Sequence, residues 1–279
     1  MFIKRFILQS GMYEYFDYTQ KAKNGSNRDS FELDNMLTSE FDQIFQSLKG
    51  EPKTIRSNKG DIHVPYIIDF KANKNNLKVF RKKINQSSGL VCLLVDVSGS
   101  MESRIDMVRK LVANFYASIA DIQRITLKVY LYSSSYYNAH DLTITEINDL
   151  SECDKIVVDV GSDYNIGTPT HYALDYVTNQ NKNYVGKKVL ICLTDGHPAI
   201  YENDNLHLDA KLKLECKKAI LNAEELSFNI FGLGIQLPEY TVDSFKNMFR
   251  DNFVNIRTYD DLRIQLFDKL GDFVRGIRA

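Results

Sequence analysis

Continuous apolar runs alternate with amphipathic segments over most of the chain. The strand-like runs cover residues 63–70, 90–97, 125–132, 156–160, 188–194, 228–235 and 253–256. Between them, apolar residues recur every three or four positions, as on one face of a helix. The clearest stripes are Val108, Leu111, Val112, Phe115 and Ile119; Leu212, Cys216, Ala219, Ile220 and Ala223; and Leu262, Leu266, Phe267, Leu270 and Phe273. This alternation predicts a doubly wound α/β fold, with a mostly parallel sheet and helices on both faces.

The first sixty residues follow a different pattern and predict a small N-terminal helical extension. One amphipathic helix is expected there, with Ser30 as its N-cap and with Gly50 followed by Pro52 at its end. Its apolar positions are Leu37, Phe41, Ile44, Phe45 and Leu48. The sequence therefore predicts an extension over residues 1–60 and a main domain over residues 61–279.

Composition and charge narrow the functional class. The 279 residues are 44% hydrophobic and 25% charged, with 35 basic and 36 acidic side chains and a net charge of −1. This balance argues against a dedicated nucleic-acid binder, although residues 71–83 are rich in lysine and arginine. We interpret that basic run as a solvated face. The alternative is a polyanion site, in which Phe80 would stack on a base of RNA or DNA.

The chain carries no signal that we can assign to a membrane or a secretory route. No apolar run approaches the roughly 18–20 residues that span a bilayer, and Lys4 and Arg5 break the apolar start. The four cysteines lack the spacing of a disulfide framework or a zinc ribbon. They are Cys92, Cys153, Cys192 and Cys216. We expect a soluble, cytoplasmic protein.

Oxygen-bearing side chains gather in three loops that follow strands or precede helices. These loops span residues 96–101, 165–170 and 193–198. The ligands of doubly wound folds bind at the carboxyl ends of the strands, where two of these loops lie. Two carboxylates and three hydroxyls suit a small hard cation such as Mg²⁺. The candidate metal ligands are Asp96, Ser98, Ser100, Thr168 and Asp195. Thr168 is also placed to cap a helix that has Pro169 at its first position.

These loops carry a resemblance to a known family. The segments Asp96-Val97-Ser98-Gly99-Ser100-Met101, Gly167-Thr168 and Leu193-Thr194-Asp195-Gly196 resemble the metal-ion-dependent adhesion site of von Willebrand factor type A domains, over about residues 61–279. The resemblance implies a Rossmann-like fold and a site for Mg²⁺, with Mn²⁺ or Ca²⁺ as alternatives. It implies direct coordination by Ser98 and Ser100, and coordination by Asp96 and Asp195 directly or through water. Thr168 supplies the ligand of the middle loop, with Thr170 as the competing candidate.

Within the family, the chain is similar to the intracellular von Willebrand subunits of cobaltochelatase and of nitric oxide reductase activation proteins. Such proteins work with hexameric AAA+ ATPases. The resemblance implies an adaptor or substrate-recognition module, not an enzyme, that binds an Asp or Glu of a partner protein through the metal. A subunit of a chelatase-like complex is the alternative. We expect partner contacts from Met101, Thr170 and His197.

Two other readings of the same residues remain open at the level of sequence. An Asp after a buried strand resembles the nucleophile of haloacid dehalogenase phosphatases, but Ser98 stands where that family has its second acid. His171 and His197 could bind zinc with Asp195. The sequence contains no Gly-x-x-x-x-Gly-Lys-Ser/Thr phosphate loop, so that any ATP hydrolysis would belong to a partner.

Overall fold

An eight-stranded sheet, in the strand order β11-β10-β9-β6-β7-β8-β1-β2, forms the centre of the molecule. The computed structural model describes residues 3–9, 12–18, 33–46, 48, 54–57, 61–62, 64–73, 78–83, 88–120, 122–134, 141–156, 167–196, 198, 208–258, 261, 265 and 267–276. The strands of the large sheet are β1 (Ile3–Gln9), β2 (Met12–Tyr18), β6 (Gly89–Asp96), β7 (Ile125–Ser133), β8 (Asp141–Ile147), β9 (Lys187–Thr194), β10 (Phe228–Ile235) and β11 (Phe253–Ile256).

The sheet is parallel from the edge strand β11 to β7 and antiparallel from β7 to the other edge strand, β2. Strands β11, β10, β9, β6 and β7 pair in parallel. Strand β8 is antiparallel to β7, and β1 and β2 continue the antiparallel arrangement. Residues 3–9 and 12–18 thus extend the main sheet with two strands that the sequence analysis did not predict. The predicted α/β class, with a mostly parallel sheet, is confirmed.

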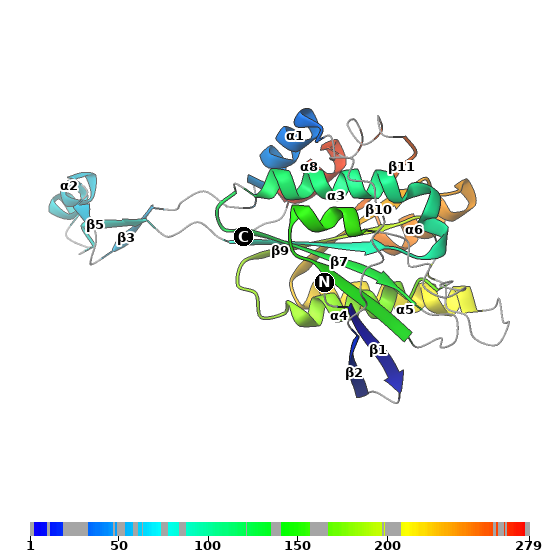
Figure 1. Cartoon of the computed structure of the whole chain (residues 1–279). Helices are drawn as coiled ribbons and strands as arrows, with labels where there is room; N and C mark the ends of the chain where they lie inside the picture. The colour runs from blue at the N-terminus through cyan, green and yellow to red at the C-terminus, as the bar shows by residue number, and fades with distance from the viewer. Residues whose placement is uncertain are drawn as a thin grey trace.

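Helices cover both faces of the sheet (Figure 1). One face carries α1 (Asn35–Gln46), α3 (Ile105–Ile119) and α8 (Phe267–Gly276), and the other carries α4 (Thr170–Gln180), α5 (Leu208–Glu225) and α6 (Glu239–Phe249). We call these the α3 side and the α5 side. The structure also describes two short 3₁₀ helices. One, η2 (Gly99–Arg104), precedes α3, and the other, η3 (Leu150–Lys155), follows β8.

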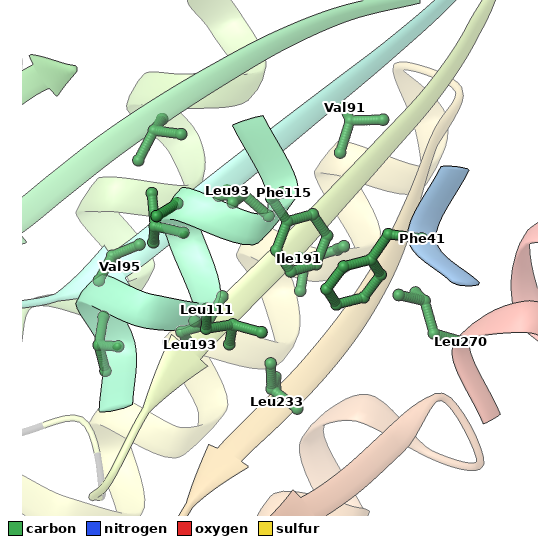
Figure 2. Close-up of a cluster of buried hydrophobic side chains, with 14 of the residues drawn as sticks. Phe41, Val91, Leu93, Val95, Leu111, Phe115, Ile191, Leu193, Leu233 and Leu270 are labelled. Atoms are coloured by element: carbon green, nitrogen blue, oxygen red, sulfur yellow. The ribbon is translucent and has the colours of Figure 1, made fainter. Parts of the chain in front are cut away.

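The apolar core is divided by the alternation of side chains along each strand. On β6, Val91, Leu93 and Val95 face the α3 side, whereas Leu90 and its alternate neighbours face the α5 side. Every residue of β6 is buried. Figure 2 shows the α3 side, where β6 and β9 side chains pack against residues of α1, α3 and α8. Burial on both faces explains why these strands read as continuous apolar runs.

Helix α1 belongs to this core. Its predicted apolar stripe is buried, and the centroid of the Phe41 ring lies 4.1 Å from that of Phe115 in α3 and 5.1 Å from that of Phe267 in α8. The helix begins later than predicted, because the Asp34 carboxylate accepts the N–H groups of Met36 and Leu37. Ser30, the predicted cap, lies outside the described residues. The division of the chain at residue 60 stays a prediction.

A small module stands apart from the main sheet (Figure 1). It has a three-stranded sheet and one helix, in which β3 pairs with β5 and β4 pairs with β5. Its elements are β3 (Thr54–Ser57), β4 (Asp61–Ile62), α2 (Val64–Asn73) and β5 (Phe80–Lys83). The predicted strand over residues 63–70 is therefore wrong. Pro65 explains the difference, because proline cannot donate to a strand ladder but fits the first turn of a helix.

Two further elements differ from the sequence prediction. The strand next to β7 is β8, which the sequence analysis missed, and residues 157–160 of the predicted strand lie outside the described residues. Ile156 itself follows η3 and is not in a strand. Strand β8 buries Leu142 and Ile144 on the α5 side and alternates them with threonine, so it lacks the continuous apolar run of the central strands.

Candidate metal centre

The candidate site lies at the carboxyl edge of the parallel sheet, where β6 and β9 end side by side. Asp96 is the last residue of β6, and Asp195 follows the last residue of β9. The two strands pair in parallel from Gly89 to Val95, so both carboxylates meet at the same edge. The ends of β6 and β9 are therefore neighbours in the sheet. Asp96 is completely buried, and Asp195 is 5% exposed.

The Asp96 carboxylate is held by two hydrogen bonds. Its Oδ1 accepts the backbone N–H of Ser98 at 2.9 Å, and its Oδ2 accepts the Thr194 hydroxyl at 2.7 Å. The first bond closes the tight turn after β6, and the second joins the ends of β6 and β9. Asp96 therefore fixes the position of the loop that carries the two serines.

Three hydroxyls and the second carboxylate form a continuous cluster. Ser98 Oγ and Ser100 Oγ lie 3.1 Å apart, and Thr168 Oγ1 lies 3.3 Å from Ser98 Oγ. The Ser100 hydroxyl donates to Asp195 Oδ1 at 2.8 Å. Asp96 lies beside this cluster. The structure thus brings together all five side chains that we predicted as metal ligands from the sequence. Their role as ligands stays a prediction.

The middle loop is held against the end of β7. The backbone N–H of Ser134, just after β7, donates to the Gly167 carbonyl at 3.1 Å. Helix α4 begins at Thr170, with Pro169 in the N-cap position, so the predicted capping role of Thr168 is wrong. The Thr168 hydroxyl points instead to Ser98. Thr170, the competing candidate, places its hydroxyl 3.1 Å from the Tyr132 hydroxyl, away from the serine cluster.

The geometry of this cluster fits a small divalent cation. Adjacent oxygens in an octahedral Mg²⁺ site, with metal–oxygen distances of about 2.1 Å, are about 3.0 Å apart. The contacts among Ser98, Ser100, Thr168 and Asp195 range from 2.8 to 3.3 Å. Within the described part of the chain, no three His, Cys, Asp or Glu residues form a metal-binding group. The described donors are thus hard oxygens, and His197 of the zinc alternative lies outside the described residues.

The electrostatics of the two carboxylates also favour a cation. Burial, together with the smaller effect of the nearby Asp195 charge, raises the pKa of Asp96 to about 6, although the hydrogen bonds from Ser98 and Thr194 lower it. Burial raises the pKa of Asp195 as well, whereas Ser100 and Arg104 lower it. Two neighbouring buried carboxylates are costly to ionise together, so positive charge at this edge stabilises the ionised pair.

Arg104 is part of the site, and the sequence analysis missed it. Its Nη1 donates to Asp195 Oδ2 at 2.8 Å and to the Ser100 carbonyl at 2.8 Å. The spacing offers a signal, since a residue four positions after Ser100 in a helical turn lies over the same face. That signal requires knowing that η2 follows the loop directly.

The predicted partner contacts are not supported for two of the three residues. Met101 is completely buried among the apolar residues of the α3 side, so its side chain does not reach a partner. Thr170 is 4% exposed, and its hydroxyl faces Tyr132. Partner contacts from Met101 and Thr170 stay predictions that this burial does not support. His197 lies outside the described residues.

Comparison with known proteins identifies the fold. A family model for the von Willebrand factor type A domain matches residues 91–263. The chain belongs to this family. Von Willebrand A domains mediate protein–protein interactions, and those with an adhesion-site motif bind divalent metals. The match covers the central sheet from β6 to β11 and all three loops of the candidate site.

Several solved structures are similar to this chain at low sequence identity, and the first of them has the same fold. The pilus adhesin SpaC from Lactobacillus rhamnosus GG is 20% identical with a TM-score of 0.52, covering 69% of this chain and 31% of the adhesin. Proximal thread matrix protein 1 from the mussel byssus, with a zinc-occupied adhesion-site motif, is 13% identical with a TM-score of 0.43, covering 68% and 48%. VWA2 from Sulfolobus acidocaldarius is 17% identical with a TM-score of 0.38, covering 65% and 44%.

The chain spans about half or less of the length of each of these proteins. No curated protein matches it significantly. Among the described residues, no helix has the length and apolar character needed to cross a membrane.

Proposed function

We propose that this von Willebrand A domain is a protein-binding module that recognises an Asp or Glu side chain of a partner through a Mg²⁺ site. The observation that carries the proposal is the convergence of five oxygen-bearing side chains from three loops at one edge of the sheet. When bound, a divalent cation supplies positive charge and an open coordination position for a carboxylate. Ser98, Ser100 and Thr168 would hold it, and Asp96 and Asp195 would balance its charge.

Burial indicates the side from which a partner approaches. Asp96, Ser98 and Thr168 are almost completely buried, whereas Gly99 and Ser100 are exposed. The serine loop therefore forms the rim of the site, and a partner side chain would enter over Ser100. Mg²⁺ is favoured over zinc because the described donors are carboxylates and hydroxyls, with Mn²⁺ and Ca²⁺ as the alternatives.

A non-catalytic role is part of the proposal. A phosphatase of the dehalogenase type needs an acid two residues after its nucleophile, and Ser98 stands at that position, with its N–H bonded to Asp96. The other carboxylate of the site, Asp195, is paired with Arg104 and accepts from Ser100. Neither arrangement supplies a general acid or base poised toward solvent.

The proposed partner is a hexameric AAA+ ATPase or a protein that such a machine remodels. The form of the Asp-x-Ser-Gly-Ser-Met motif and the lack of a phosphate loop in this sequence support an adaptor that leaves ATP hydrolysis to its partner. A cytoplasmic location belongs to the same proposal, because ATP is supplied there. A subunit of a chelatase-like complex is a narrower form of this adaptor role.

Isothermal titration calorimetry with Mg²⁺, Mn²⁺ and Ca²⁺ tests the site. Ser98→Ala and Thr168→Val should each weaken Mg²⁺ binding by about tenfold or more, because each removes an oxygen from the cluster. The matched control is Ser118→Ala, another buried serine, whose hydroxyl donates to the Phe115 carbonyl inside α3. Equal Mg²⁺ affinity in all four proteins would overturn the metal assignment.

A pull-down with a candidate AAA+ ATPase tests the partner. Wild type should retain the ATPase in Mg²⁺ and lose it in chelator, and Asp195→Ala should lose it in both. Retention by wild type that is equal with and without chelator would reject a metal-dependent contact. Retention by Asp195→Ala in Mg²⁺ would reject the role of this site.

A further inference from the structure

Arg104 places a positive charge directly behind the metal-binding carboxylates. It is the last residue of η2, and its Nη1 donates to Asp195 Oδ2 and to the Ser100 carbonyl, both at 2.8 Å. Its side chain is 20% exposed, while that of Asp195 is 2% exposed. One guanidinium thus contacts both a candidate ligand and the rim of the site, and part of it faces solvent.

This pair differs from the other arginine–carboxylate pairs that the structure describes. In those pairs the carboxylate side chains of Asp106, Glu224 and Glu239 are 83%, 37% and 87% exposed. Among the described residues, Arg104 Nε is also a buried donor that has no acceptor. A buried donor without an acceptor is rare in folded proteins and calls for an explanation. The placement of Arg104 therefore points to a role for its charge at the site.

The two oxygens of Asp195 are divided between the site and Arg104. Oδ1 accepts from the Ser100 hydroxyl on the side of the cluster, and Oδ2 accepts from Arg104 on the other side. Arg104 therefore leaves Oδ1 directed toward the metal position. It also offsets one of the two negative charges that Asp96 and Asp195 carry when ionised.

The count of charges decides what such a site attracts. Two carboxylates alone would balance a divalent cation completely, and a third carboxylate from a partner would then gain no net electrostatic attraction. With Arg104 beside Asp195, one positive charge remains, and a single incoming carboxylate brings the site to neutrality. In a site with little water, one unit charge at this distance has a large effect on binding.

We propose that Arg104 is a specificity-determining residue that makes the metal-loaded site selective for a carboxylate ligand. The inference rests on the proposed function, because it assumes that a divalent cation occupies the cluster. It predicts that removing the charge of Arg104 weakens carboxylate binding without weakening cation binding. A role limited to holding Asp195 in place would weaken cation binding first.

The experiment uses Mn²⁺ as the metal and acetate as the ligand. Mn²⁺ affinity is measured by calorimetry, and acetate binding is followed by the fall in water proton relaxation as acetate replaces water on the bound Mn²⁺. Acetamide, which is neutral, serves as the control ligand. The variants are Arg104→Gln and Arg104→Lys. Arg250→Gln is the matched control, because Arg250 precedes β11 and lies toward the opposite edge of the sheet.

In Arg104→Gln we expect acetate binding to weaken by about tenfold or more, while the Mn²⁺ dissociation constant falls or stays within about threefold of wild type. Arg104→Lys, which keeps the charge, should retain most of the acetate binding. Arg250→Gln should match wild type in both titrations.

Three outcomes would contradict the inference in different ways. Unchanged acetate binding by Mn²⁺-loaded Arg104→Gln would overturn it and leave the proposed function intact. A large loss of Mn²⁺ affinity in that variant would show that Arg104 acts by positioning Asp195, which also overturns it. Failure of the wild type to bind Mn²⁺ would overturn the proposed function itself and the inference with it.

Discussion

The interior of strand β6 and its carboxyl end are equally buried but chemically opposite. From Leu90 to Val95 every side chain is apolar and packs on one side of the sheet or the other. At the next position, Asp96 is just as deeply buried but carries a carboxylate beside that of Asp195. Burial stabilises the fold along the strand, whereas at its end burial costs free energy until a positive charge is present. A functional site can therefore be recognised by the position at which burial stops being favourable.

Removal of a buried apolar side chain from the core should change the stability most. Phe41→Ala should lower the free energy of unfolding by about 3–5 kcal/mol, because it removes a ring packed between α3 and α8. Urea denaturation measures the change. Met36→Ala, on the same helix but exposed, should change stability by less than about 0.5 kcal/mol. Similar values for the two variants would show that α1 does not pack on the domain in solution.

Removal of the buried charge at the end of β6 should have the next largest effect on stability. In chelator near neutral pH, Asp96→Asn should raise the free energy of unfolding by about 1–3 kcal/mol, because it removes a buried charge next to Asp195. In saturating Mg²⁺ the order should reverse, because wild type gains binding free energy that the variant loses. Thermal denaturation in both buffers measures the two differences.

Asp243→Asn serves as the control, because that carboxylate is exposed on α6. A wild type that is more stable than Asp96→Asn even in chelator would mean that the buried carboxylate is not a cost to the metal-free fold.

The free energy cost of ionising the buried Asp96 should also appear in the pH dependence of the stability of the metal-free protein, as a smaller effect. Burial raises the pKa of Asp96 from its ordinary value of 3.8 to about 6, so the folded state binds this proton more tightly than the unfolded chain. The resulting stabilisation is complete below the unfolded value and is lost as the pH rises through about 6.

Melting temperatures in chelator at about pH 5 and about pH 7.5 test this sign. The melting temperature of wild type minus that of Asp96→Asn should be higher at the lower pH than at the higher pH. In Mg²⁺ the trend should reverse, since protons compete with the cation for the carboxylate. A difference that does not change with pH would contradict the raised pKa.

The smallest expected effect concerns the thiols of the interior. All four cysteines are buried, and burial raises the pKa of Cys92 to about 12 and that of Cys192 and Cys216 still higher. We expect no reaction with a disulfide reagent in native buffer and four equivalents after denaturation. Rapid modification of Cys216 in the native state would mean that α5 separates from the sheet.

Sequence reasoning succeeded where one physical requirement dominated a segment. β6 and β9 lie in the middle of a parallel sheet and must be apolar on both faces, and the stripes of α3 and α5 must cover them, so the patterns were strong. The loop after β6 also carried a clear pattern. Its carboxylate and hydroxyls predicted a cluster of oxygens, and the structure brings them together with Thr168 and Asp195.

The errors arose where several requirements competed in a short segment. β8 alternates Leu142 and Ile144 with threonine, a weaker pattern than a continuous run. Residues 64–73 are apolar enough for a strand, but Pro65 and the pairing of β3, β4 and β5 leave them as a helix. Arg104 depends on the exact path of η2, and the burial of Met101 depends on how that turn meets α3. Neither can be read from residue types alone.

The contact of α1 with both α3 and α8 has a consequence for the order of folding. Residues 35–46 are synthesised long before residues 267–276, so the apolar stripe of α1 waits for partners that are distant in sequence. Contacts between residues far apart in the sequence form late, because the entropy cost of closing a long loop precedes the free energy that the contacts supply. The pairing of β1 with β8 is a contact of the same kind. The central strands and their crossover helices can therefore assemble first, and the N-terminal segment joins them as the last layer of the domain.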